Sequence, residues 1–292
     1  MTYSFVIVGL LAIGLPAAFA FAMHAGFKAP RIKHFGDPAD FGMNFNSVNI
    51  PGHEGHDLVA WHLIAATGPA TPTILIIHGW GANMEMMLPL AQVFYRAGMN
   101  CLLVDARNHG HSPDDGISSL PQFAQDCDAA IDWLKGENGD HTGPLAVLGH
   151  SVGAGAVLLI ASKREDIDAV ISISSFAHPL WLMQRHLQRP KKSLYVLRYL
   201  APVVMRYTQW MIGHRFEDIA PMNAICKVKC PVLLVHGTKD TVIPLADMHA
   251  IAENCSDKKP EILLIEDAGH ESIDKIKQHD KDLVNFLKRN GF

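Results

Sequence analysis

LAVLGHSVGAGAVLLIASK occupies Leu145–Lys163 and contains a G-x-S-x-G motif centred on Ser151. An apolar run precedes the motif and small aliphatic residues follow it, so the sequence predicts a strand that turns at once into a buried helix. A turn this sharp needs glycine on both sides and raises the serine hydroxyl above the end of the sheet. The free N–H groups of the following helix would face the same point and favour a developing negative charge there. The alternative is a glycine-rich helix start in which Ser151 only caps the helix.

The overall composition is that of a globular chain with a large apolar core. Of its 292 residues, 49% are hydrophobic and 18% are charged, which suits one large α/β domain with or without a small appendage. The formal net charge of -4 at pH 7 gives no global positive field, so we expect no nucleic-acid partner. The odd cysteine count and irregular spacing require neither a zinc site nor an oxidising compartment. The cysteines are Cys101, Cys127, Cys226, Cys230 and Cys255.

The N-terminal stretch Met1–Met23 contains no Asp, Glu, Lys or Arg and is long enough to cross a bilayer as a helix. We therefore predict an N-terminal transmembrane helix that anchors the protein in a membrane. A cleaved signal peptide is one alternative, because Ala18–Ala20 resembles a cleavage site, and a buried helix of the globular domain is another. Positive charges follow the stretch at Lys28, Arg31 and Lys33. By the positive-inside rule they place the following domain in the cytoplasm, the alternative being a secreted or periplasmic location.

Residues 24–40 carry Pro and Gly with little periodicity, which predicts a linker, and we expect one domain over 41–292. Within that domain apolar runs alternate with helical stretches, as in a mostly parallel sheet covered by helices on both faces. The first two strands form a hairpin at the sheet edge. The predicted strands are Phe45–Ile50, Leu58–Ile64, Thr73–Ile77, Asn100–Val104, Leu145–Leu148, Ala169–Ile173, Pro231–Val235 and Glu261–Ile265. The predicted helices are Met84–Ala97, Pro121–Lys135, Ala154–Ala161, Leu245–Asn254 and Lys275–Lys288.

The alternation stops between Ser175 and Val232, an interval too long for one crossover helix. We predict that residues 177–229 form a helical cap over the strand ends, whose apolar face lines a substrate pocket and whose basic face suits an anionic membrane surface. The alternative is that its aromatic residues pack only on the core. The aromatic and Met residues are Trp181, Met183, Tyr195, Tyr199, Met205, Tyr207, Trp210 and Met211, and the basic ones are Arg185, Arg189, Lys191, Lys192, Arg198, Arg206 and Arg215.

Three chemically reactive residue types follow apolar strands in the order Ser151, Asp240, His270. The carboxyl ends of parallel strands meet at one edge of a sheet, so these side chains are expected to lie together. A serine nucleophile needs a base to take its proton and a carboxylate to orient that base. We predict these roles for Ser151, His270 and Asp240 respectively, with Asp267 and Asp247 as alternative carboxylates.

With these residues in place, the sequence resembles the α/β-hydrolase superfamily over Asn44–Phe292, and within it the capped esterase, monoacylglycerol-lipase and serine-aminopeptidase-like members. The matching motifs are HGWG at His78–Gly81, DARNHGHS at Asp105–Ser112, GHSVG at Gly149–Gly153, HGTKD at His236–Asp240 and DAGH at Asp267–His270. The resemblance implies an oxyanion hole formed by the backbone N–H groups of Trp80 and Val152. It implies no metal or organic cofactor. We expect a structural role for the His78 side chain. We expect Asp105, Arg107 and His109 to brace the loop beside the site.

Two-step acyl transfer on a carboxylic ester is the leading functional hypothesis, because an apolar cap and a membrane anchor suit a lipid-like acyl substrate. A serine peptidase or amidase is the alternative; it would favour an acid in the pocket, for which Glu217 and Asp218 are the cap candidates. Acyltransfer to an alcohol and a non-catalytic binding role are the other possibilities. The turn histidines match no standard metal spacing, so we expect no metal there; they are His53, His56 and His62.

Overall fold

The computed structural model describes residues 2–136, 141–188, 200–255 and 259–292, with side chains in the first helix from Gly14 onward. An eight-stranded sheet with the order β1-β2-β4-β3-β5-β6-β7-β8 forms its centre. β1 pairs antiparallel with β2, β2 pairs antiparallel with β4, and every other neighbouring pair is parallel. The strands are β1 (Phe45–Ile50), β2 (Leu58–Leu63), β3 (Thr73–Ile77), β4 (Asn100–Val104), β5 (Leu145–His150), β6 (Ala169–Ile173), β7 (Val232–Gly237) and β8 (Glu261–Ile265).

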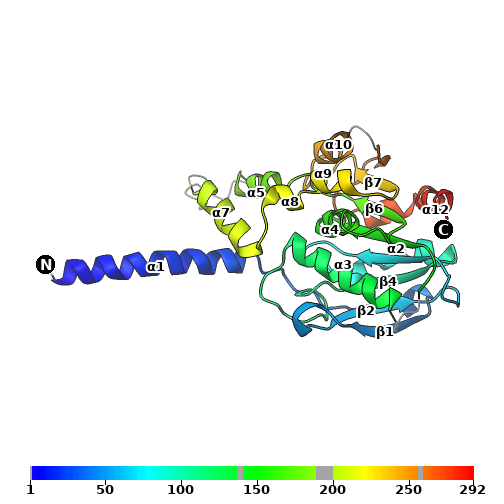
Figure 1. Cartoon of the computed structure of the whole chain (residues 1–292), viewed down its shortest axis with the longest axis horizontal. Helices are drawn as coiled ribbons and strands as arrows, with labels where there is room; N and C mark the ends of the chain where they lie inside the picture. Colours follow the sequence, from blue (N-terminus) through cyan, green and yellow to red (C-terminus); the bar gives the residue numbers. More distant parts are fainter. Residues whose placement is uncertain (1, 137–140, 189–199, 256–258) are drawn as a thin grey trace.

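Helices cover both faces of the sheet, as the alternating sequence pattern predicts (Figure 1). In β3, Leu75 and Ile77 pack with α3 (Leu120–Lys135) and α4 (Val152–Ala161). The alternate residues Ile74 and Ile76 pack on the opposite face with α2 (Leu88–Arg96) and α12 (Asp280–Arg289). Both faces of the central strands are therefore buried, which explains their unbroken apolar runs. The remaining helices of the core are α10 (Leu245–Glu253) and α11 (Ile273–Lys277), with the 3₁₀ turns η1 (Pro38–Phe41), η2 (His53–Gly55) and η3 (Met84–Met87).

Two predicted helices differ from the observed ones. The stretch predicted as one helix over Met84–Ala97 begins as η3 and becomes α-helical at Leu88, where Pro89 occupies a first-turn position that needs no donor. The stretch predicted over Lys275–Lys288 is divided into α11 and α12. The other predicted strands and helices of the core agree with the structure to within about two residues.

The insert between β6 and β7 is helical, as predicted, and comprises α5 (Pro179–Gln188), α7 (Ala201–Ile212), α8 (Phe216–Ile219), α9 (Pro221–Ala224) and η4 (Ile225–Lys227). Residues 189–199, which include the cap residues Tyr195, Tyr199 and Arg198, lie outside the described residues. The aromatic rings are not all directed inward, since Trp210 is 73% exposed. An ion pair fixes the cap to the core: the terminal guanidinium nitrogens Nη1 and Nη2 of Arg185 donate to the buried carboxylate of Asp247 on α10, at 2.9 and 2.7 Å.

The N-terminal segment differs most from expectation. Helix α1 covers Thr2–Gly26 and extends away from the sheet, with its C-terminal end against the cap (Figure 1). Within the part of the chain that the structure describes, no helix combines the length and hydropathy needed to cross a bilayer. The predicted membrane anchor is therefore not supported. Residues 24–40, predicted as a linker, bind the loops beside the sheet through backbone and side-chain groups.

A disulfide joins Cys226 in η4 to Cys255, just beyond α10, with their Cα atoms 5.4 Å apart. The irregular cysteine spacing had given no indication of this bond. The pairing depends on the packing of α9 and η4 beside α10, and a separation of 29 residues along the chain gives no hint of it. Cys101 and Cys127 are buried and not disulfide-bonded.

Candidate active site

Ser151 lies at the sharp turn between β5 and α4. Its backbone has φ 55°, a left-handed value that costs energy for a residue with a side chain. The two glycines of the motif make this turn possible: a Cβ on Gly149 would overlap the Gly153 carbonyl, and a Cβ on Gly153 would overlap the His78 carbonyl. The turn places the serine hydroxyl at the carboxyl end of β5 and the first N–H groups of α4 beside it.

Ser151, His270 and Asp240 lie in one hydrogen-bonded chain. The Oγ of Ser151 is 2.9 Å from Nε2 of His270, and Nδ1 of His270 is 2.7 Å from Oδ2 of Asp240. The other carboxylate oxygen of Asp240 accepts the N–H groups of Val242 and Ile243, at 2.9 and 2.8 Å. A carboxylate held in this way keeps one imidazole tautomer and orients the ring toward the serine.

Asp240 is held as an anion despite its burial. Burial alone would raise the pKa of its carboxyl, but the hydrogen bond from His270 and the two backbone N–H groups outweigh it and lower the pKa below its ordinary value. The neighbouring histidines are kept neutral, because burial lowers the pKa of both His236 and His150. His150 donates from Nε2 to the backbone carbonyl of His270 at 2.9 Å, and so fixes the loop that carries the base.

The two alternative carboxylates lie elsewhere. Asp267 is largely exposed and pairs with Lys239 at 2.6 Å on the surface. Asp247 is buried but is occupied by Arg185 and by the N–H of Ala177. The structure therefore brings only Asp240, of these three, to the His270 imidazole.

The loop after β3 carries Trp80, whose backbone N–H was predicted to face the reaction together with that of Val152. Within the described residues we find no hydrogen-bond acceptor for either N–H group. Two neutral histidines hold this loop. His78 donates from Nδ1 to the Gly79 carbonyl at 2.7 Å and accepts the Ala106 N–H at Nε2, at 3.1 Å. His109 accepts the Gly81 N–H at Nε2, at 3.0 Å.

Both histidines have a lowered pKa because of burial, and that of His78 falls to about 4, with the adjacent His109 as the next cause. Each ring must be neutral, since it accepts a backbone N–H at one nitrogen. Protonation would convert that acceptor into a donor and break the contact. These histidines are thus suited to holding the loop rather than to exchanging protons with a substrate.

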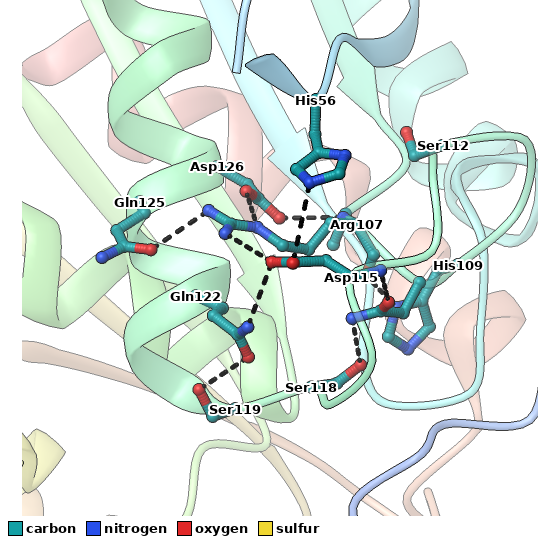
Figure 2. A network of polar contacts seen from close by, with 12 residues as sticks. His56, Arg107, His109, Ser112, Asp115, Ser118, Ser119, Gln122, Gln125 and Asp126 are labelled. Carbon is teal, nitrogen blue, oxygen red and sulfur yellow. Dashed lines mark hydrogen bonds and ion pairs between the residues drawn. The ribbon is translucent and has the colours of Figure 1, made fainter. Parts of the chain in front are cut away.

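The DARNHGHS loop is braced by hydrogen bonds and ion pairs of its charged side chains Arg107 and Asp105. Arg107 is buried and its guanidinium donates to Asp126, Asp115 and Gln125, while its backbone N–H also binds Asp126 (Figure 2). The carboxylate of Asp105 accepts the N–H groups of Met84 and His111 and contacts His34 at 2.9 Å. These partners lower the pKa of Asp105 although burial opposes them.

A cavity of about 500 Å³ opens above Ser151. Its lining is mostly apolar and includes Leu182 and Met183 from α5 and Val204 from α7, so the cap does line a pocket. The predicted cap acids do not: Glu217 borders a separate open hollow beside α7. Met23, Phe27 and Glu271 are among the lining residues that sequence reasoning missed. Glu271 was detectable as the acid directly after the DAGH motif, whereas no pattern marked Met23 or Phe27.

Among the residues that the structure describes, no group of three or more His, Cys, Asp or Glu side chains lies close enough together to bind a metal ion. The turn histidines are dispersed instead. His56 lies 3.7 Å from Asp115, and the His62 ring packs edge-on against Trp133.

Comparison with known proteins gives one family and several distant relatives. The family model described as serine aminopeptidase, S33, matches residues 68–221. The chain is 27% identical over 228 residues to the uncharacterized protein YqkD of Bacillus subtilis, a match that covers 77% of this chain and 72% of YqkD. It is 26% identical over 230 residues to the uncharacterized membrane protein YNL320W of Saccharomyces cerevisiae, covering 77% and 74% of the two chains. The solved Pyrococcus furiosus esterase Pf2001 superposes with a TM-score of 0.71 at 21% identity, covering 90% and 97%, which shows a shared fold.

Proposed function

Because the chain belongs to the serine aminopeptidase S33 family of α/β hydrolases, we propose that it is a serine hydrolase that cleaves carboxylic esters with apolar acyl groups. The observation that carries this proposal is the hydrogen-bonded chain from Ser151 through His270 to Asp240, which lies at the floor of a largely apolar cavity. The esterase name of Pf2001, a structural neighbour, is consistent with it.

Acylation would begin at Ser151. Nε2 of His270 accepts the hydroxyl proton while Oγ forms a bond to the ester carbonyl carbon. The carbonyl oxygen becomes an oxyanion, for which the N–H groups of Trp80 and Val152 and the N-terminus of α4 provide stabilisation. The bond to the alkoxide oxygen then breaks, His270 returns the proton to that oxygen, and the alcohol leaves an acyl-enzyme on Ser151.

Deacylation repeats these steps with water. His270 takes a proton from the water, whose oxygen bonds to the acyl carbon, and the same two N–H groups stabilise the second oxyanion. The bond to Ser151 Oγ breaks, His270 protonates Oγ, and the carboxylic acid leaves. Asp240 stays ionised throughout and stabilises the imidazolium that forms at each step, which its lowered pKa favours.

Amide hydrolysis is a second candidate, and Glu271 is the observation that favours it. This carboxylate lines the cavity 4.0 Å from Nε2 of His270, where it could bind a substrate amine. Its side chain is 78% exposed, however, so its attraction for a cation is screened by water. We therefore rank the ester above the amide. A Glu271→Gln variant that loses activity on aminoacyl amides while retaining it on esters would reverse this order.

The cellular location stays a proposal. The charges after Met23 favour the cytoplasm, whereas a Cys226–Cys255 disulfide is typical of oxidising compartments and favours the secreted or periplasmic alternative. A C-terminal reporter enzyme that is active only outside the cytoplasm distinguishes them. Reporter activity would contradict the cytoplasmic placement.

A fluorophosphonate probe tests the proposed chemistry directly, because it reacts with activated serines. We expect labelling of the wild-type protein, none of Ser151→Ala, and normal labelling of the control Ser162→Ala, which alters a serine at the other end of α4. Hydrolysis of a panel of esters should fall by about 10⁶-fold in Ser151→Ala. A folded wild-type protein that takes up no probe would contradict the proposal and favour a binding role. Labelling with transfer to added alcohols, but no hydrolysis, would indicate an acyltransferase.

A further inference from the structure

We propose that the N-terminal segment is part of the acyl site, and that Phe27, supported by Met23, determines which acyl chains the pocket accepts. Both residues precede the predicted domain and lie outside the part of the chain that matches the family model. The proposal rests on the proposed function, since it specifies the substrate of the same site.

The cavity that contains Ser151 and His270 is lined on one side by the last turn of α1, through Ala22, Met23 and Gly26, and by Phe27 directly after it. The Phe27 ring meets the indole of Trp80 edge-on, with ring centroids 6.4 Å apart. Trp80 belongs to the loop predicted to bind the oxyanion, so Phe27 borders the side of the cavity next to that loop.

Residues 27–34 are also firmly attached to the core. Met23 and Phe27, which form one wall of the cavity, can limit acyl chain length only if that wall is held in place. The Phe27 carbonyl accepts the N–H of Ser118 at 2.8 Å, and Ala29 is buried. The Arg31 guanidinium donates to the Ser112 carbonyl at 2.6 Å. Further along, the imidazole of His34 and the carboxylate of Asp105 form a contact in which both side chains are buried. Phe27 is thus held by contacts on its C-terminal side to the same loop that carries Asp105 and Ser112.

The other end of the wall is fixed by the cap. The ring of Phe19 in α1 packs edge-on against Tyr207 in α7, with centroids 5.2 Å apart, and His24 packs on the same ring. The last turn of α1 is therefore placed between the cap and the Trp80 loop. Met23 in this turn and Phe27 directly after it line the same cavity as Leu182 from α5 and Val204 from α7.

An apolar wall at this place predicts a defined chain-length limit. Each methylene that an acyl chain buries contributes about 0.8 kcal/mol, or about fourfold in kcat/KM, until the chain meets the wall. Removing the Phe27 ring lengthens the space, and a larger ring shortens it. The limit should therefore move in opposite directions in Phe27→Ala and Phe27→Trp, which simple loss of folding cannot produce.

The experiment uses the full-length chain and p-nitrophenyl esters of saturated acids from acetate to myristate. In Phe27→Ala, kcat/KM for esters with acyl chains longer than the wild-type optimum should rise by about fourfold for each additional methylene that the pocket admits. Met23→Ala should show the same effect to a smaller extent. In Phe27→Trp the acyl chain length that gives the highest kcat/KM should be shorter than in wild type. The matched control is Phe35→Ala, which alters a phenylalanine of the same segment that is 93% exposed and does not line the cavity. An optimum that is the same in the Phe27 variants as in wild type would overturn the proposal.

Alkyl fluorophosphonates of increasing chain length separate this proposal from the proposed function. Their rate of reaction with Ser151 reports pocket length even if no ester is cleaved. Labelling without ester hydrolysis would refute only the esterase function. The preferred alkyl length of the probe, compared between wild type and the Phe27 variants, would still show whether Phe27 limits the length of the pocket. A Ser151 that no probe labels would overturn both.

Discussion

Acid should destabilise the protein through His78, the buried histidine that connects the loops after β3 and β4. Its ring donates to the Gly79 carbonyl and accepts the Ala106 N–H. A second ring proton would face the Ala106 N–H and place a charge where no solvent reaches, since the residue is fully buried. Burial and the nearby His109 accordingly lower the pKa of His78 from 6.5 to about 4.

The magnitude follows from the linkage between protonation and folding. Above pH 6.5 the ring is neutral in the folded and the unfolded chain, and its contribution to stability is fully present. Between pH 6.5 and about pH 4 only the unfolded chain takes up the proton, so the free energy of unfolding falls as the pH falls. Below about pH 4 both states are protonated and the loss stops. At 1.36 kcal/mol for each pH unit, the total loss is about 3 kcal/mol.

Urea unfolding of wild type and His78→Gln, from about pH 7 to about pH 4, isolates this contribution from that of the other histidines. The stability difference between the two proteins should shrink by about 3 kcal/mol over that range. His249→Gln, which changes an exposed histidine on α10, is the matched control. A stability difference between wild type and His78→Gln that is independent of pH would show that His78 does not take up the proton that destabilises the folded protein.

Three further predictions concern the orienting carboxylate, the cap and the disulfide. Asp240→Asn should lower kcat by about 10⁴-fold with little change in Tm, because the imidazole loses its tautomer and orientation; a near-normal kcat would argue against this role. Asp247→Asn should weaken the bidentate pair with Arg185 and cost about 2 kcal/mol in urea unfolding, whereas an unchanged midpoint would show that the cap is held otherwise. Cys226→Ser should cost about 3 to 4 kcal/mol under oxidising conditions and nothing in reductant; equal losses in both would mean that Cys226 and Cys255 are not bonded.

The sheet and the serine turn could be predicted because local chemistry determines them. The unbroken apolar run before Gly149 requires a strand buried on both faces, and the two glycines permit the backbone strain at Ser151. The order of Ser151, Asp240 and His270 along the chain then sufficed to expect them at one edge. Their distances of 2.9 and 2.7 Å come only from the folded structure.

The N-terminal segment could not be predicted, because its contacts are to residues far away in the sequence. Residues 27–37 form neither a helix nor a strand, so they leave no periodic pattern in the sequence. Hydrogen bonds of this segment go to Ser112, Ser118 and Glu85. The cap shows the same limit. Its composition predicted an apolar lining, but not that Trp210 would face outward while Val204 lines the cavity.

In the proposed mechanism, Ser151 attacks a carbonyl whose oxygen is bound by two backbone N–H groups, and the acyl chain lies against Phe27. The most direct test is a crystal structure of the protein after reaction with an alkyl fluorophosphonate. We expect phosphorus bonded to Ser151 Oγ, the phosphoryl oxygen within about 3 Å of the amides of Trp80 and Val152, and the alkyl chain beside Phe27. Phosphorus on another residue, or a phosphoryl oxygen directed away from both amides, would contradict the account.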